Sequence, residues 1–211
     1  IAALAVAFAA ALNSIFPIDP VVQKVIAIST VLLLTLINIR GVRMGSSLQS
    51  WSMILKMFPI LLILFAGLFF GTESPDLTAM PAEMPSWSTL MSMIGFAVIA
   101  TLWAYEGWTN LNNIAEEIKN PRRNIPLALI LAITGVMVLY VLFNYSIFRV
   151  VPYDKIVEMV NSGNYYLGTE AANSLFGSAG LVIVGVAMVL AIFNSLNGCV
   201  LAFPRMYYAM A

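Results

Sequence analysis

The sequence predicts an all-α protein that crosses a membrane several times, and three observations support this fold class. Hydrophobic residues make up 61% of the 211 residues and charged residues only 9%, against about 45–50% and about 25% in soluble domains. The mean hydropathy is +0.93. Long uncharged stretches approach or exceed the roughly 20 apolar residues that a membrane-spanning helix needs. They are residues 1–18, 25–39, 57–72, 84–105, 124–148 and 171–204.

Helix breakers between these stretches set the expected boundaries. Pro17 and Pro20 follow the first helix, Gly41 the second, and a proline-rich loop the third. The fourth segment is too long for one span and is polar in its middle, so we expect a broken helix. Asn124 is expected to cap the fifth helix. The expected helices are 1–16, 21–39, 47–71, 87–119 with a break, 125–150 and 178–208, all parts of one transmembrane domain.

The two ends of the sequence suggest a piece of a longer membrane domain. Ile1 enters an apolar stretch directly, without the basic segment that opens a secretory signal peptide. The last residues contain no helix stop. We therefore expect both ends to be cuts through a larger bundle.

The loop charges predict an orientation in a cell membrane. One set of helix ends carries most of the basic residues, namely Arg40, Arg43, Lys119, Arg122, Arg123 and Arg205. The opposite set carries the acids Asp19, Glu73, Asp76, Glu83, Asp154, Glu158 and Glu170. Because basic loops stay in the cytoplasm, the first set is expected to face inside.

Composition also excludes several classes of protein. Ten basic and ten acidic residues cancel, whereas a nucleic-acid binder has a basic patch. The chain has no histidine and one cysteine, Cys199, so zinc enzymes and histidine-based triads are excluded. We expect no metal, no cofactor and no enzymatic activity.

Two ionisable side chains fall within the expected spans, Lys56 and Glu106. A charge near the bilayer centre costs about 2.5–3.5 kcal/mol or more, so such residues usually face a cavity or a partner. If its helix starts at Ser47, Lys56 lies about 14 Å along it. That depth favours a functional role over snorkelling to the interface.

Glu106 and Gly107 interrupt the fourth segment, and two interpretations remain open. The helix could be ordinary, with a polar face packed inside a bundle. Alternatively it is unwound, and its backbone groups bind a ligand at mid-membrane, as in transporters. Trp103, Tyr105 and Trp108 surround the interruption and favour the second interpretation without deciding it. Residues 194–198 are likewise either packing residues or polar contributors to a central site.

Several motifs resemble the amino acid–polyamine–organocation superfamily, specifically its L-type amino acid transporter branch. They are residues 102–108 (LWAYEGW) and 115–128 (AEEIKNPRRNIPLA), supported by 38–42 (NIRGV), the helix around Lys56, Asn197-Gly198 and 205–210 (RMYYAM). The resemblance covers essentially the whole chain. It implies a leucine-transporter-like fold of two inverted five-helix repeats, of which this chain is the end of helix 3 and helices 4 to 8, with a discontinuous helix 6.

The resemblance also implies site residues. The unwound part of helix 6 corresponds to Trp103, Ala104, Tyr105, Glu106 and Gly107. Backbone groups around Trp103, Ala104 and Glu106 would receive the substrate α-amino group, and the Trp103 side chain would gate it. The α-carboxylate would be held by a break in helix 1, which this chain lacks.

Lys56 matches a helix-5 lysine that takes the place of a sodium ion in sodium-coupled relatives, and Ser195 would be its helix-8 neighbour. The family pattern leaves open whether the lysine stays charged, which suits exchange, or releases its proton, which suits proton coupling. In either case we expect no need for sodium.

Two departures from the family pattern matter. Many members have a small residue at the position of Glu106, so this residue is expected to influence which amino acids bind. Animal members have a cysteine between helices 3 and 4 for a disulfide to a glycoprotein, but residues 16–20 here contain none. We therefore expect no disulfide-linked subunit.

The sequence thus predicts an amino acid transporter that works by alternating access in the lipid bilayer. A non-transporting amino acid sensor of the same fold is the alternative. An intramembrane hydrolase is a third possibility, but it would need a nucleophile with a base, and the chain has no histidine.

Overall fold

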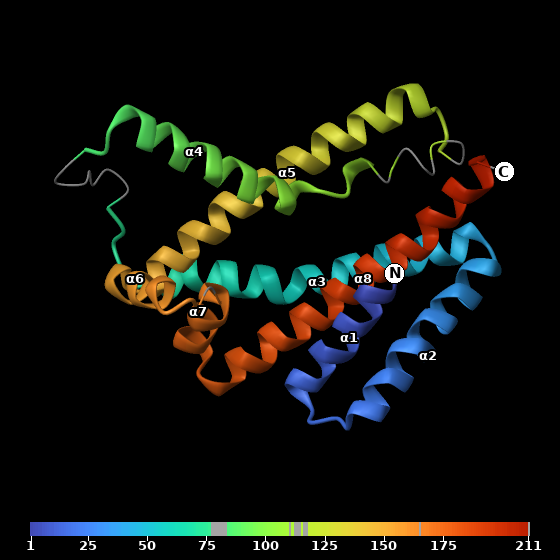
Figure 1. Cartoon of the computed structure of the whole chain (residues 1–211), viewed down its shortest axis with the longest axis horizontal. Coiled ribbons are helices and arrows are strands. Elements are labelled where there is room, and N and C mark those ends of the chain that lie inside the picture. Colours follow the sequence, from blue (N-terminus) through green and yellow to red (C-terminus); the bar gives the residue numbers. More distant parts are fainter. Residues whose placement is uncertain (77–83, 110, 112–114, 116–117, 165, 211) are drawn as a thin grey trace. The chain divides into compact units, whose positions relative to one another are not determined.

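The computed structural model describes residues 1–76, 84–109, 111, 115, 118–164 and 166–210, without the side chains of Val42, Trp103, Met206, Tyr208 and Ala209. Within these residues every regular element is a helix (Figure 1), so the predicted all-α class is confirmed. The chain divides into two compact units. The larger unit is Ile1–Ser74 with Tyr140–Ala211, and the smaller is Pro75–Leu139.

The larger unit holds most of the helices. They are α1 (Ala2–Ile15), α2 (Pro20–Ile39), α3 (Val42–Phe70), α6 (Tyr153–Asn161), α7 (Leu167–Phe176) and α8 (Ser178–Met210). The smaller unit holds α4 (Trp87–Leu102) and the 3-10 turn η1 (Trp103–Tyr105). Helix α5 (Pro121–Val150) starts in the smaller unit and ends in the larger one.

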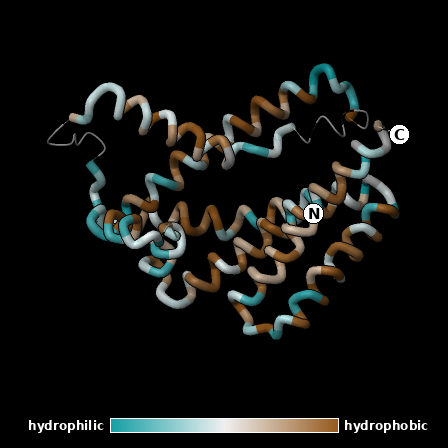
Figure 2. The backbone as a smooth tube through the Cα atoms, in the orientation of Figure 1, coloured by the Kyte–Doolittle hydropathy of each residue, from teal (hydrophilic) through white to brown (hydrophobic). Residues whose placement is uncertain are grey.

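Several of these helices suit a membrane. In the described part of the chain, four are long and apolar enough to cross one: Pro20–Ile39, Arg43–Phe70, Pro121–Val150 and Ser178–Arg205. Helices α1 and α4 are also apolar but have 14 and 16 residues. Figure 2 shows long hydrophobic runs along the helices. The chain is a multi-pass helical membrane protein, as predicted.

Local chemistry explains how α2 and α3 begin. The Asp19 carboxylate accepts a hydrogen bond from the Val21 amide at 2.8 Å, which caps α2 just before Pro20 in its first turn. Gly41 has a φ of +135°, a conformation that favours glycine, and it allows α3 to begin at Val42. Lys56 is therefore the middle residue of a 29-residue helix, about 21 Å from its start, rather than about 14 Å as the sequence suggested.

Helix α5 also starts earlier than expected. It begins at Pro121, and the Asn120 carbonyl accepts hydrogen bonds from the amides of Arg123 and Asn124 at 3.1 and 3.0 Å. Asn124 is thus inside the first turn, and the prediction that it caps the helix is wrong. Its side chain instead reaches back to the Lys119 carbonyl at 2.5 Å. Proline is well suited to a first helical turn because the missing N–H would have no partner there.

The polar stretch 152–176, to which the sequence analysis assigned no helix, contains α6 and α7. Ile156 and Ala171 are buried in one cluster with Ile147 of α5 and with Val151, which follows the end of α5. Lys155 of α6 forms an ion pair with Glu170 of α7. Short amphipathic helices of this kind are stabilised by packing more than by propensity, which is why composition did not reveal them.

Helix α8 is the centre of the larger unit. It packs against α1, α2, α3 and α7 (Figure 1). Small side chains allow the closest of these contacts, since Ala5, Ala9 and Ala27 are buried together with Leu196. Helix interfaces in membranes favour such residues because the backbones can then approach. Helix α8 therefore fixes where the polar groups of α3 lie.

Candidate functional site

The predicted interruption of the fourth segment is present. The α-helix ends at Leu102, and residues 103–105 form a 3-10 turn. Gly107 follows with a φ of +113°, a value that strains any residue with a side chain. Together these features end the regular hydrogen-bond ladder of α4. Backbone groups of residues 103–107 are thereby taken out of continuous helix.

The side chains at this break are mostly open to their surroundings. Ala104 and Glu106 are exposed, and Tyr105 is partly buried. Thr109 Oγ1 donates to Glu106 Oε1 at 3.4 Å, a long contact within the same turn. The Trp103 side chain lies outside the described residues, so its role as a gate stays a prediction.

Lys56, the second predicted site residue, lies in the larger unit. It is partly buried at the midpoint of α3. Among the described residues, its Nζ has no hydrogen-bond or ion-pair partner. Its position at the middle of α3 is consistent with a charge deep in the membrane, and such charges usually have a functional role.

Ser195 lies on α8 and is exposed, whereas its neighbours Asn194 and Leu196 are buried. Within the described part of the chain, Ser195 and Lys56 form no hydrogen bond with each other. Their pairing therefore stays a prediction. The polar residue that α8 does bring to α3 is Asn194, which contacts Ser52, one turn before Lys56.

Asn194 belongs to a buried group of side chains that we call the amide cluster. Its members are Asn38 of α2, Gln49 and Ser52 of α3, and Asn194 and Asn197 of α8. Ser52, Asn194 and Asn197 are 6%, 4% and 0% exposed. Buried polar groups in a membrane need partners inside the protein, and the members of this cluster supply most of them to one another. Among the described residues, Asn38 Oδ1 is buried without a hydrogen-bond partner.

Gln49 is the centre of the amide cluster. Its Nε2 donates to Asn194 Oδ1 at 2.7 Å, and its Oε1 accepts from Asn197 Nδ2 at 2.8 Å. Asn194 Nδ2 in turn donates to the Gln49 carbonyl at 3.2 Å and to Ser52 Oγ at 2.9 Å. One side chain of α3 thus bonds two asparagines of α8 that are three residues apart.

Helix α2 joins the amide cluster through Asn38. Its Nδ2 donates to Asn197 Oδ1 at 3.2 Å, and Asn197 Nδ2 also donates to the Gly45 carbonyl at 3.3 Å. A Cβ on Gly45 would lie 2.0 Å from Asn38 Oδ1. Glycine at position 45 thus leaves the space that the end of the Asn38 side chain occupies.

The sequence analysis identified part of this cluster. It singled out residues 194–198 and the motif that begins at Asn38, but it did not identify Gln49 and Ser52. The available signal was helical spacing, because Gln49 and Ser52 precede Lys56 by seven and four residues and so lie on its face of the helix.

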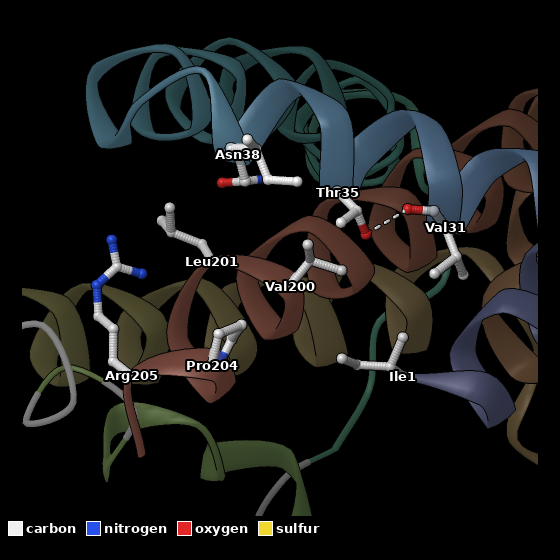
Figure 3. Close-up of a pocket in the computed structure, with 9 residues that line it drawn as sticks. Ile1, Val31, Thr35, Asn38, Val200, Leu201, Pro204 and Arg205 are labelled. Carbon is white, nitrogen blue, oxygen red and sulfur yellow. Dashed lines mark hydrogen bonds between the residues drawn. The ribbon is translucent and has the colours of Figure 1, made fainter. Parts of the chain in front are cut away.

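Among the described residues, the larger unit contains at least three cavities, two of which are lined in part by α8. The first, about 420 Å³, lies between the start of α1, α2 and α8 (Figure 3). Its walls are mainly apolar, and the Thr35 hydroxyl there already donates to the Val31 carbonyl at 2.8 Å. Arg205 is the ionisable residue of this wall.

The second cavity, about 370 Å³, lies beyond Lys56 along α3. Ile60 and Ile63 of α3 face Ala187 and Ala191 of α8 across it. Helices α5 and α7 contribute the remaining walls, with Thr169 among them. Lys56 therefore lies between the amide cluster on one side and an apolar space on the other.

The comparisons with known proteins agree with this architecture. The amino acid permease family matches residues 1–211. The serine/threonine exchanger SteT of Bacillus subtilis is 33% identical over 211 residues, which are 100% of this chain and 46% of that protein.

Two further relatives show how broad the similarity is. The b(0,+)-type amino acid transporter 1 of Oryctolagus cuniculus is 31% identical over 89% of this chain and 37% of its own length. The methylthioribose transporter of Bacillus subtilis is 28% identical over 86% of this chain and 36% of its own length. The chain spans less than half the length of these relatives. By the match over its full length, the chain belongs to the amino acid permease family.

Proposed function

We propose that this chain is part of an amino acid transporter that works by alternating access. The observation that carries the proposal is the helix break at residues 103–107 in a chain of the amino acid permease family. Unwound backbone at membrane depth needs polar partners, and transporters use such breaks to bind substrate. The α-amino group of an amino acid is a suitable donor for the carbonyls that the break releases.

The proposed roles follow the family pattern. Backbone groups of Trp103, Ala104 and Glu106 receive the α-amino group, while Tyr105 and Gly107 complete the turn. The Trp103 side chain covers the substrate. Among the described residues, the exposed Glu106 carboxylate makes one long contact, with Thr109 in its own turn, and it is proposed to contact a substrate side chain.

Lys56 is proposed to replace a coupling cation. Its ammonium can donate three hydrogen bonds to carbonyls and hydroxyls that would otherwise bind a metal ion, with Ser195 as one such group. Exchange is the preferred mode, because SteT, similar over this whole chain, is a serine/threonine exchanger.

The setting of the transporter is part of the same proposal. We infer that it acts as a carrier in the bilayer rather than as an enzyme, with its basic loops in the cytoplasm. The loop between α1 and α2 contains no cysteine. A disulfide to a second subunit at this loop is therefore not expected.

The first test measures whether Lys56 replaces sodium. Uptake of labelled amino acids by the full-length protein in vesicles should persist when choline replaces sodium. Lys56→Ala should abolish uptake while the protein still inserts, because the buried cation is lost. Lys24→Ala, an exposed lysine of α2, is the matched control and should transport normally. Strong sodium dependence, or normal uptake by Lys56→Ala, would refute this role.

The second test concerns Glu106. Competition assays with lysine, serine and leucine should show a changed preference in Glu106→Gly, by an amount of order 1–3 kcal/mol, since a hydrogen bond or charge contact with the substrate is lost. An unchanged ranking at normal expression contradicts the proposed contact. Substrate binding without any uptake would instead favour the sensor.

A further inference from the structure

The face of α3 that contains Lys56 changes from polar to apolar along the helix. Gly45, Gln49, Ser52, Lys56 and Ile60 are spaced by three or four residues, so they lie on one side of the helix. Gly45, Gln49 and Ser52 contact the asparagines of α8, and Ile60 shares a cavity with α8 residues. Lys56 therefore lies on the side of α3 that faces α8, between a polar and an apolar section.

The bonded pairs define an antiparallel register between α3 and α8. From Gly45 to Ser52 along α3, the bonded partner on α8 moves back from Asn197 to Asn194. If α8 slid along α3 by one helical turn, the residues opposite Gln49 would be those four positions away from Asn194 and Asn197. Toward the N-terminus of α8 those are Leu190 and Phe193, which cannot hydrogen-bond an amide. A slide in that direction therefore leaves the buried amide of Gln49 without its present partners, which is costly in a membrane.

We propose that the amide cluster sets the register of α3 on α8 and that Asn194 is thereby a positioning residue for Lys56. Asn194 is suited to this role because it makes three bonds to α3, one through its Oδ1 and two through its Nδ2. Ser52, one of its partners, is one turn from Lys56, so an error in register would move the ammonium directly. The inference rests on the coupling role proposed for Lys56.

The register can be measured independently of transport. In the full-length protein with its cysteines replaced, Cys199→Ala among them, Ile60→Cys is combined with either Ala187→Cys or Ala191→Cys. These positions line one cavity, and Lys56 stays intact. After mild oxidation, mass spectrometry of the digested protein gives the yield of each disulfide, and their ratio reports how α3 lies on α8.

In the parent protein one disulfide should dominate. Asn194→Leu should change the ratio about tenfold and lower the uptake rate by a similar factor. Tenfold corresponds to about 1.4 kcal/mol, near the contribution of two or three interhelical hydrogen bonds in a membrane. Asn144→Leu is the matched control, because the Asn144 amide is exposed and donates to Tyr140 of its own helix. It should change neither quantity.

A second variant covers the possibility that Asn194→Leu fails to insert. Ser52→Ala removes one of the bonds of Asn194 and should change the ratio in the same direction by a smaller factor. An unchanged ratio in the variants that insert overturns the inference, whatever happens to uptake. If the ratio changes while Lys56→Ala still transports, the register is set as proposed but the coupling role of Lys56 fails.

Discussion

The two ends of α3 are held by different chemistry. Near its start, Gln49 and Ser52 bond the side chains of Asn194 and Asn197 on α8. Near its end, groups of α5 donate to carbonyls of the α3 backbone. There, the Ser146 hydroxyl donates to Ile63 and Leu64 at 3.4 and 3.1 Å, and Arg149 donates to Gly71.

The two kinds of contact differ in how strongly they select one register between two helices. Side-chain amides occur at few positions, so bonds between them select one register. Backbone carbonyls occur at every residue, so bonds to them hold two helices together with less selection. Between the two ends lies Lys56, followed by Pro59, which cannot donate a hydrogen bond to the Leu55 carbonyl. Near the proposed cation, the backbone hydrogen-bond ladder of α3 therefore lacks one bond.

Both ends of α3 nevertheless have a glycine at a point where atoms of other residues approach the backbone closely. A Cβ at Gly71 would lie 2.4 and 2.6 Å from the carbonyl oxygens of Gly67 and Arg149. Neither backbone atom can move cheaply, so Gly71→Ala should give the largest loss of stability, about 3 kcal/mol, at the upper end for overpacking. The midpoint of thermal unfolding in detergent measures it.

Gly135→Ala provides the control for this substitution. Gly135 lies inside α5, and a Cβ there would meet nothing within 4 Å. Because alanine is the better helix former, by roughly 0.5–1 kcal/mol, this variant should be neutral or slightly more stable. Equal losses in the two variants would show that close approach at Gly71 is not the cause.

The same parts of the molecule show how much of the fold could be predicted from the sequence. The helical fold is confirmed, and it was predicted from uncharged length. The interruption after Leu102 was predicted from a glycine beside polar residues at 106–107, while much of the expected helix from there to residue 119 lies outside the described residues. The start of α3 at Val42 was not predicted, since the Arg40–Arg43 turn is shorter than its polarity suggests. Helices α6 and α7 were missed because packing against α5 stabilises them, and packing cannot be inferred from composition.

Some residues of the candidate site could be predicted from the sequence, and others could not. Lys56 and Glu106 stand out as charges in apolar segments, and Asn194 and Asn197 as amides in one. Their partners do not stand out, because Gln49 and Asn194 are 145 residues apart and a membrane helix offers several polar residues. Helical spacing places Gln49 and Ser52 on the same face as Lys56, but only the register of α3 on α8 shows which residues they bond.

Gly45→Ala tests the first end of α3 and should have an intermediate effect. The new Cβ would lie 2.0 Å from Asn38 Oδ1, the end of a side chain that can rotate away. Rotation breaks its bond to Asn197, so the expected loss is about 1–2 kcal/mol in the thermal-unfolding assay. Adding Asn38→Ala removes the clash and should recover part of the loss. No recovery would mean that Asn38 does not require this glycine.

Ser146→Ala should have the smallest effect, about 0.6 kcal/mol, which is typical for an interhelical hydrogen bond in a membrane. The carbonyls of Ile63 and Leu64 lose a second donor but keep their place in the α3 ladder. The sharper measurement is a double-mutant cycle with Gly67→Ala, whose Cβ would lie 2.1 Å from Ser146 Oγ. Removing the hydroxyl should make Gly67→Ala less harmful, giving a coupling of at least about 0.5 kcal/mol. Relief stays partial because the Ser146 carbonyl is also only 3.0 Å away, and strictly additive losses would show that the hydroxyl does not set the α3–α5 distance.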